Sequence, residues 1–193
     1  QAPEAAAANR ADAVDRAANL RKIKAMTPHK AFIALGSNLG QPTDNLLSAL
    51  QALSEDSRWQ LLAYSSLYGS KPMGPQDQPD YVNAVCSVTT ELTAAELLQA
   101  LHDIEDAFGR KRVRHWGERT LDLDLLLFGE QQHHSEQLKV PHPGLYERNF
   151  VLFPLAEIAP DKILPNGNTV KQQAEALTED GLDVIICSSD III

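Results

Sequence analysis

The stretch Arg110-Lys-Arg-Val-Arg-His-Trp-Gly-Glu-Arg-Thr-Leu-Asp-Leu-Asp-Leu-Leu-Leu-Phe128 has two halves of opposite charge. Residues 110–119 contain five Lys or Arg and one acid, and the run that follows alternates leucine with Asp122 and Asp124. Alternation with a period of two is typical of a half-buried strand. We therefore expect one face to carry Leu121, Leu123, Leu125 and Leu127. The other face is expected to carry Asp122, Asp124, Leu126 and Phe128.

Two carboxylates on one face of a strand have Cα atoms roughly 6.5 Å apart. At this spacing they can hold one or two Mg²⁺ ions, which prefer oxygen ligands and keep substrate phosphates in their shell. The cationic residues upstream can bind the remaining phosphate charge. An Asp-x-Asp pair also occurs on solvated strand faces, but here apolar residues continue that face, and the basic segment carries Trp116 and Gly117. The stretch therefore favours phosphoryl or nucleotidyl transfer.

The composition fits one globular domain. The chain has 193 residues, of which 44% are hydrophobic, and its formal net charge is −9. A chain of this length can bury one good core. An acidic protein is a poor general nucleic-acid binder, because such binding uses a basic surface. We expect small-molecule substrates, no nucleic-acid partner and a monomer.

Residues 1–29 differ in composition from the rest of the chain. They are rich in alanine and polar side chains, without the apolar centre of a signal peptide. Because Met26 stands just before the first apolar strand, we interpret residues 1–29 as an appended or disordered segment and residues 30–193 as a single domain. The two cysteines, Cys86 and Cys187, indicate no disulfide framework, and no apolar run reaches the length of a membrane span. We expect a cytoplasmic protein with no membrane partner.

Hydrophobic periodicity predicts the order of the elements. Helices are expected from Pro42 and from the capping box Thr93-Ala-Ala-Glu96. Strands are expected over residues 30–35, 59–68, 81–90 and 121–128. The order strand, helix, strand, strand, helix, strand is the split βαβ pattern. We therefore predict an α+β fold with a ferredoxin-like βαββαβ core, an antiparallel sheet covered by helices, and C-terminal additions, although residues 161–193 carry no motif.

Two connections and one strand have functional interpretations. Gly36-Ser-Asn-Leu-Gly40 lacks the Lys-Ser/Thr ending of a P-loop, so we interpret it as a tight turn in which Asn38 tolerates unusual dihedrals. Residues 70–80 hold three prolines and one glycine, which predicts a long but stiff loop of a kind that is commonly functional. The strand after this loop places Tyr81 and Asn83 on one face, where an amide suits the edge of a heterocycle.

The segment Trp116-Gly-Glu-Arg-Thr-Leu-Asp-Leu-Asp-Leu-Leu resembles the signature of the 6-hydroxymethyl-7,8-dihydropterin pyrophosphokinases, which act in folate biosynthesis. The resemblance extends from about Phe32 to about Pro165. This chain departs from the family pattern at Glu118, where a small residue or proline is usual. It also has one residue fewer between Gly109 and Trp116, so no individual roles are assigned to Lys111, Arg112 and Arg114.

The resemblance implies that ATP and 6-hydroxymethyl-7,8-dihydropterin give AMP and the pterin diphosphate. It implies two Mg²⁺ ions held by Asp122 and Asp124, with Arg110 and Arg119 as further catalytic residues. The positions that match ATP-binding residues are His102, Glu105, Trp116, Arg119, Leu125, Lys139, His142 and Arg148. Those that match pterin-binding residues are Ser70, Met73, Tyr81, Asn83, Trp116 and Phe150. Trp116 would cover the pterin when its loop closes.

Two other classes of function use the same predicted fold. A palm-type nucleotidyl transferase also carries paired acids on such a sheet, but it would release pyrophosphate instead of AMP. An RNA-binding module would need exposed aromatic residues in its strand motif and a basic sheet, and the sequence contains neither pattern.

Overall fold

The computed structural model of the chain describes residues 28–74, 77–109 and 118–193. Residues 1–27, with the proposed start at Met26, and residues 110–117, with Arg110 and Trp116, lie outside the described residues. The elements in order are β1 (His29–Ser37), α2 (Pro42–Glu55), β2 (Trp59–Tyr64), β3 (Leu67–Ser70), β4 (Tyr81–Thr90), α3 (Ala94–Ala107), β5 (Asp122–Phe128), β6 (His133–His134), β7 (Lys139–Val140), α4 (Asn149–Ile158), α5 (Val170–Glu175), β8 (Leu182–Ile186) and the 3₁₀ helix η1 (Ser188–Asp190).

The main sheet has six strands in the order β5-β1-β4-β3-β8, with β2 also paired to β4, and all of these pairings are antiparallel. The predicted combination of helices with an antiparallel sheet is thus confirmed. The prediction of one strand over residues 59–68 is wrong. Ser65 interrupts it, because its hydroxyl accepts a hydrogen bond from the Val85 N–H at 3.0 Å in place of a backbone carbonyl. β2 and β3 therefore pair separately with β4.

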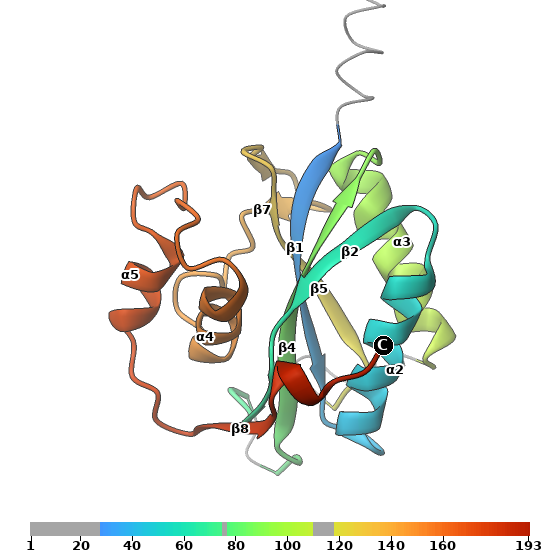
Figure 1. Cartoon of the computed structure of the whole chain (residues 1–193), viewed down its shortest axis with the longest axis vertical. Coiled ribbons are helices and arrows are strands. Elements are labelled where there is room, and N and C mark those ends of the chain that lie inside the picture. The colour runs from blue at the N-terminus through green and yellow to red at the C-terminus, as the bar shows by residue number, and fades with distance from the viewer. Residues whose placement is uncertain (1–27, 75–76, 110–117) are drawn as a thin grey trace, which may run out of the picture.

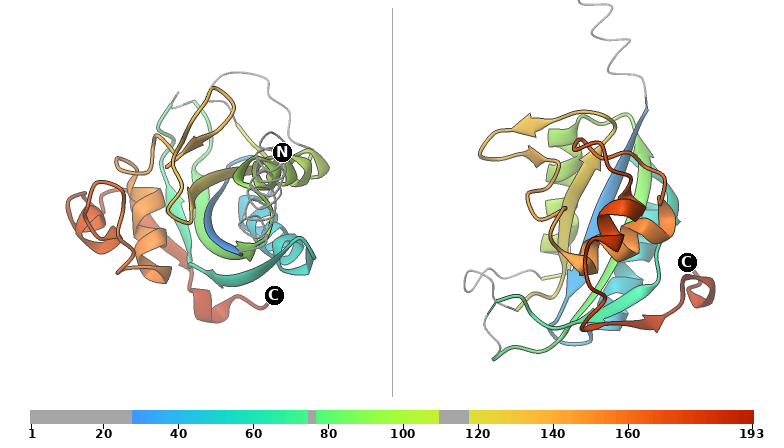
Figure 2. Two further views of the ribbon diagram at one scale, coloured as in Figure 1. Left: turned by 90° about the horizontal axis from the view of Figure 1, so that it is seen from above. Right: turned by 90° about the vertical axis from the view of Figure 1, so that its left-hand side faces the viewer.

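Helices cover both faces of the sheet (Figures 1 and 2), with α2 and α3 on one face and α4 and α5 on the other. Each interface holds its own apolar cluster. The central strand β4 contributes to both, because Ala84 and Cys86 pack toward α2 and α3 while Val85 packs toward α4. Among the described helices, none has the length and apolar character needed to cross a membrane.

The helices α2 and α3 form where local signals predict them. α2 begins with Pro42 in its first turn, and α3 begins with the capping box in which Thr93 and Glu96 exchange hydrogen bonds. Each helix buries one stripe of leucines against the sheet. α3 is followed by Gly109, whose φ of 73° is the left-handed conformation that ends many helices.

Strand β5 does not keep its predicted alternation to the end. Leu125 and Phe128 both pack in the cluster beneath α2 and α3, whereas Leu126 and Leu127 both pack beneath α4. The pairing with β1 shifts register at this point, which marks a β-bulge. The extra residue reverses the alternation, so the predicted faces of Leu127 and Phe128 are wrong. The two aspartates precede the bulge and are not affected.

The C-terminal segment, which carries no sequence motif, is part of the fold. Strand β8 extends the sheet by pairing with β3. Beyond it, the Tyr64 hydroxyl donates to the Ile191 carbonyl oxygen at 3.1 Å, and the Ile191 side chain is buried in the cluster beneath α2 and α3. The Glu157 carboxylate of α4 accepts hydrogen bonds from the Ser188 hydroxyl at 2.8 Å and from the Ser66 N–H at 2.9 Å. Apolar contact thus accounts for two residues of the terminal isoleucine run, because Ile193 is partly buried against the same cluster, whereas Ile192 is 96% exposed.

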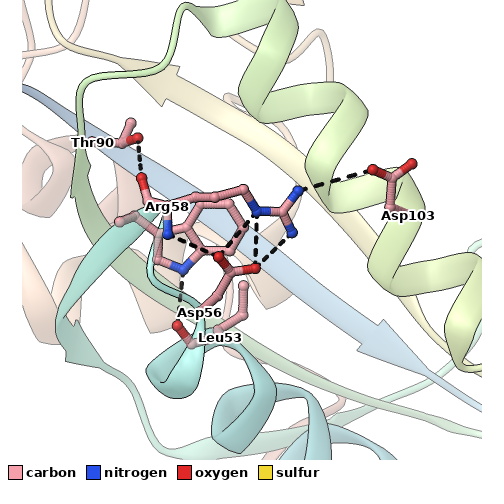
Figure 3. A network of polar contacts seen from close by, with 6 residues as sticks. Leu53, Asp56, Arg58, Thr90 and Asp103 are labelled. Atoms are coloured by element: carbon pink, nitrogen blue, oxygen red, sulfur yellow. Dashed lines mark hydrogen bonds and ion pairs between the residues drawn. The ribbon is translucent and has the colours of Figure 1, made fainter.

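Figure 3 shows a network at the turn between α2 and β2. The Arg58 guanidinium donates to the Asp56 carboxylate at 2.6 Å and lies 3.9 Å from the Asp103 carboxylate on α3. Arg58 also lies over the ring of Trp59, 4.9 Å from its centroid, and the Trp59 indole N–H donates to the Leu53 carbonyl at 2.8 Å. One arginine therefore joins this turn to α3.

Replacing Arg58 with methionine should remove this link and weaken the fold slightly. Hydrogen bonds from Arg58 hold the pKa of Asp56 below its ordinary value. A depressed folded pKa stabilises the protein above the unfolded pKa of about 4, and this contribution is lost as the pH falls through the folded value. We expect Arg58→Met to lower the free energy of unfolding by about 0.5–1 kcal/mol at neutral pH and by less below about pH 4. Urea denaturation measures both values.

The control is Lys171→Met, which removes an exposed pair with Glu175 whose atoms are 3.9 Å apart. This variant should have almost no effect at either pH. A destabilisation by Arg58→Met that grew in acid would contradict the assignment to the Asp56 ion pair.

Candidate active site

One cavity opens beside the amino-terminal end of β5, between the sheet, α4 and the loop that follows β3. Nine of the residues predicted as site residues line it, namely Ser70, Met73, Tyr81, Asn83, Arg119, Asp122, Asp124, Arg148 and Phe150. They come from positions spread over some eighty residues of the chain. Only the tertiary structure brings them to one place.

The two aspartates face this cavity because β1 provides small neighbours for them. Gly36 is the strand partner of Asp122, and Ala34 is the partner of Asp124. A Cβ atom added at Gly36 would lie 3.8 Å from the Asn83 Oδ1 and 4.0 Å from the Asp122 Cβ. It would therefore fill the space between the acids and the amide. Sequence reasoning treated Gly36 only as part of a turn, although a glycine inside a strand is itself a sign of close approach.

The charges around the two acids are arranged to favour a bound cation and a polyanion. Burial raises the pKa of Asp124, and repulsion from the carboxylate of Asp122 raises it further, whereas His142, Arg148 and Arg119 act in the opposite direction. A divalent cation between the carboxylates would relieve this repulsion. For Arg119, burial acts against the charged form, but the Asp122 carboxylate, to which its guanidinium donates, outweighs it and raises the pKa.

His142 does not line the cavity itself but lies next to Asp124, and a hydrogen bond fixes the tautomer of its ring. Its Nδ1 accepts a hydrogen bond from the Gly144 N–H at 3.1 Å, so the proton of the neutral ring is on Nε2. That Nε2 lies 3.7 Å from the Asp124 carboxylate. Burial lowers the pKa of His142, and the nearby Arg148 adds to this effect against the attraction of Asp124. A neutral imidazole therefore presents one N–H donor toward the acids.

The other end of the cavity is built for a flat polar ligand. The Asn83 amide nitrogen donates to the Ser70 hydroxyl at 2.9 Å and to the Tyr68 carbonyl at 3.3 Å. Because a carbonyl can only accept, this contact fixes which way the amide faces, and Oδ1 is the atom on the side of Gly36. Tyr81 and Phe150 add aromatic surface to the lining. This arrangement suits a ligand that brings an N–H donor at the edge of an aromatic ring system.

Asn38 connects the two segments that border the cavity. Its amide nitrogen donates to the Gln78 side chain and to the Pro79 carbonyl, both at 3.1 Å, and its Oδ1 accepts the Arg119 N–H at 2.9 Å. The side chain is 1% exposed. The predicted role of Asn38, tolerance of unusual dihedrals, misses this function, because its partners are far away in the sequence. It holds the backbone of Arg119 against the loop after β3.

Five of the predicted ATP-binding residues that the structure describes lie outside the cavity lining, namely His142, Leu125, Glu105, His102 and Lys139. Leu125 is 3% exposed and packs beneath α2 and α3, so only its backbone can meet a ligand. Glu105 is 1% exposed, and its carboxylate accepts the Leu123 N–H at 2.6 Å. His102 lies one turn earlier on α3, and Lys139 is exposed on β7. Glu105 thus lies at the outer edge of β5, the terminal strand of the sheet, which also carries Leu125, and His102 lies on the same helix as Glu105.

The position of Glu105 predicts a structural effect that sequence reasoning did not foresee. Glu105→Ala leaves the buried Leu123 N–H without this acceptor, and we expect the free energy of unfolding to fall by about 1–3 kcal/mol. Glu105→Gln keeps an acceptor oxygen and should retain most of the stability. Chemical denaturation of the two variants measures the difference. Equal losses would show that the negative charge, and not the hydrogen bond, is the stabilising feature.

An α+β fold whose cavity brings two carboxylates next to two arginines fits one class of protein, the enzymes that transfer phosphoryl groups. Within the described residues no group of three His, Cys, Asp or Glu side chains is placed to enclose a metal by itself. Two carboxylates are nevertheless a common protein contribution to a Mg²⁺ site, where water and substrate phosphates complete the shell. Asp122 and Asp124 fit that ion, because both offer only oxygen and their mutual repulsion favours a cation.

Comparisons with known proteins agree with this class. The family model for 7,8-dihydro-6-hydroxymethylpterin-pyrophosphokinase matches residues 32–160. The 2-amino-4-hydroxy-6-hydroxymethyldihydropteridine pyrophosphokinase of Haemophilus influenzae is 52% identical over 142 residues, which is 74% of this chain and 89% of the relative. The enzyme of the same name from Pseudomonas aeruginosa is 46% identical over 154 residues, 80% of this chain and 95% of the relative.

A solved structure gives the same fold at low sequence identity. The crystal structure of wild-type Plasmodium falciparum HPPK-DHPS with SDX-DHP matches with a TM-score of 0.60 and 14% identity, over 78% of this chain and 44% of that chain. This chain therefore spans less than half the length of that crystallised chain, and the likeness concerns the fold alone.

The chain belongs to the 7,8-dihydro-6-hydroxymethylpterin-pyrophosphokinase family. The resemblance predicted from the sequence is confirmed, and so is the predicted function, pyrophosphoryl transfer to hydroxymethyldihydropterin in folate biosynthesis.

Proposed function

We propose that the chain transfers the pyrophosphoryl group of ATP to the hydroxymethyl oxygen of 6-hydroxymethyl-7,8-dihydropterin and releases AMP and the pterin diphosphate. The proposal rests on one observation, which is that a single cavity joins two different surfaces. One is the polar and aromatic pocket of Tyr81, Asn83 and Phe150. The other is the charged group of Asp122, Asp124 and Arg119. A ligand in the first would present a substituent to the second.

The pterin is proposed to lie on the pocket beside Gly36, with Phe150 and Tyr81 contributing aromatic surface. Asn83 would recognise its edge, because the Asn83 amide nitrogen already donates to Ser70 and Tyr68 and leaves Oδ1 to accept a ring or amino N–H. A pterin has such donors on its pyrimidine side. Ser70 and Met73 would complete the pocket from the loop side.

The triphosphate is proposed to lie over the start of β5. Arg119 and Arg148 would bind phosphate oxygens, and the Nε2–H of His142 would add a neutral donor. When bound, two Mg²⁺ ions on Asp122 and Asp124 would neutralise phosphate charge and lower the pKa of the pterin hydroxyl, so that no separate base is required. The protein would then contribute mainly in-line positioning and stabilisation of the charge that develops on the leaving AMP.

The adenosine end of ATP is proposed to follow the outer edge of β5. The Leu123 N–H points away from β1, since it donates to Glu105. Successive residues of a strand alternate in direction, so the backbone of Leu125 points the same way and is available to a base. His102 and Lys139 would act from the elements on either side of this edge.

Incubation of the purified chain with ATP, Mg²⁺ and 6-hydroxymethyl-7,8-dihydropterin tests the function directly. Chromatography should detect AMP and the pterin diphosphate in equal amounts. Pyrophosphate together with a nucleotidylated pterin would identify nucleotidyl transfer and replace the proposal. Formation of ADP would identify a simple kinase.

We also propose a fold assignment, a cellular compartment and an oligomeric state for this chain. The strand order β5-β1-β4-β3, with helices α2 and α3 on one face, supports assignment of the core to the ferredoxin-like fold with C-terminal additions, within one domain of residues 30–193. The two free cysteines, Cys86 and Cys187, support a reducing cytoplasm. We propose that the protein acts there as a monomer without nucleic acid, which light scattering on the purified chain would test.

A further inference from the structure

Gly144 lies in the turn that leads from His142 into α4. The turn is closed by a hydrogen bond from the Leu145 N–H to the His142 carbonyl at 2.9 Å. A Cβ atom added at Gly144 would lie 2.6 Å from the Arg148 Cζ and 2.8 Å from its Cδ. Both separations are far shorter than carbon–carbon contact distances of about 3.5–4.0 Å. The Arg148 side chain therefore crosses this turn through space that only a glycine leaves open.

This crossing is what directs Arg148 to the site. Its side chain lines the cavity together with Asp122 and Asp124. Its guanidinium carbon lies over the Phe150 ring, 5.9 Å from the centroid. Arg148 is half-buried, and its charge acts on the pKa values of both Asp124 and His142. A displaced guanidinium would leave all of these neighbours.

We propose that Gly144 is a positioning residue for Arg148, and that its missing side chain sets the affinity of the site for the triphosphate. The inference rests on the proposed function, in which Arg148 binds phosphate oxygens. Any side chain at position 144 would occupy the space through which the Arg148 side chain passes. The flexible arginine then turns away from the cavity, and the protein loses one cation from its phosphate site without losing any residue that contacts the substrate.

Alanine at position 144 tests the steric effect on Arg148 alone. The described glycines with positive φ are Gly40, Gly109, Gly129, Gly167 and Gly181, so Gly144 has a backbone conformation that alanine can adopt. Alanine also keeps the N–H that donates to the His142 Nδ1 at 3.1 Å. The substitution therefore leaves the turn and the histidine tautomer in place. Only the collision with Arg148 is new.

The test is a double-mutant cycle of Gly144→Ala and Arg148→Ala, read as the dissociation constant of the Mg²⁺ complex of α,β-methylene-ATP by calorimetry. Each single variant should weaken nucleotide binding roughly 10- to 100-fold, the usual effect of losing a hydrogen bond to a charged group. The double variant should be no weaker than Arg148→Ala alone, because both changes remove the same contact. Glu147→Ala, an exposed neighbour in the same segment, is the control and should bind like the parent.

The dissociation constant of the pterin, measured on the same proteins, separates this effect from general damage. It should stay close to the parent value in Gly144→Ala. Parent-like nucleotide binding by Gly144→Ala would overturn the inference, because Arg148 would then reach the site by another route. Losses that multiply in the double variant would overturn it as well, since Gly144 would act independently of Arg148. If the parent chain binds the nucleotide but forms no AMP, the proposed function fails while the cycle still reports on Gly144.

Discussion

Alanine in place of Asp122 or Asp124 is expected to abolish AMP formation and to leave the chain folded. Each variant removes one of the two carboxylates that would hold Mg²⁺ against the triphosphate. Asp124→Ala should not weaken the fold, because burial and repulsion from Asp122 raise the pKa of Asp124, so its charge is unfavourable in the ligand-free protein. Quenched-flow or steady-state assays of AMP, together with urea denaturation, measure the two effects. The free energy of unfolding should be unchanged or slightly higher in Asp124→Ala. It should be somewhat lower in Asp122→Ala, which loses the carboxylate that compensates the burial of Arg119.

Asp161→Ala is the matched control for these variants. Asp161 is an exposed acid in the turn after α4, and it does not line the cavity. Its replacement should alter neither turnover nor stability. Turnover by Asp122→Ala or Asp124→Ala at saturating Mg²⁺, at a rate comparable to the parent, would remove the metal assignment. A loss of activity that simply tracked unfolding would also contradict it, because the acids would then be structural.

Arg119→Ala is expected to slow turnover about 10²- to 10³-fold, which corresponds to roughly 2.7–4 kcal/mol of transition-state stabilisation for one lost electrostatic donor. The guanidinium borders the cavity and is held by the Asp122 carboxylate. Its backbone is fixed separately, since the Arg119 N–H donates to Asn38 at 2.9 Å. Truncation of the side chain should therefore leave the neighbouring loop in place, and kcat should fall more than pterin affinity.

Arg119→Lys distinguishes charge from geometry. Lysine keeps the positive charge but not the planar fork that can bind two phosphate oxygens at once. A rate between those of the parent and Arg119→Ala is expected. If Arg119→Ala raised only the KM for the pterin and left kcat unchanged, the residue would belong to the pterin pocket, and its assignment to the triphosphate would be wrong.

Local sequence patterns predicted much of the fold. The capping box at Thr93, the proline at the start of α2 and the leucine stripes are interactions within one or two helical turns, so the sequence displays them directly. The break at Ser65 and the bulge in β5 were missed for one reason. Both depend on how a strand pairs with a distant partner, and a periodic pattern in one strand contains no information about register with another.

The sequence likewise predicted some residues of the candidate site and missed others. The long signature around Asp122 identified the family, and nine site residues matched by resemblance do line one cavity. Asn38, Gly36 and Gly144 were not recognised as parts of the site. Asn38 acts through partners up to 81 residues away, and the two glycines act through the space that they leave for other side chains. The partners of Asn38 and the path of Arg148 past Gly144 have no local signal in the sequence, and the glycine at position 36 indicates only a close approach, not which side chains need the space.

The sequence by itself determined which chemistry this protein carries, because paired acids, arginines and a recognisable signature are properties of residue types at fixed spacings. The tertiary structure alone decided how the side chains that carry this chemistry are oriented. The direction of the Asn83 amide, the tautomer of His142 and the path of Arg148 each depend on a hydrogen bond or a steric limit supplied by another residue of the folded chain. Such contacts exist only after packing has fixed the distances between atoms, which is why no pattern along the chain could specify them.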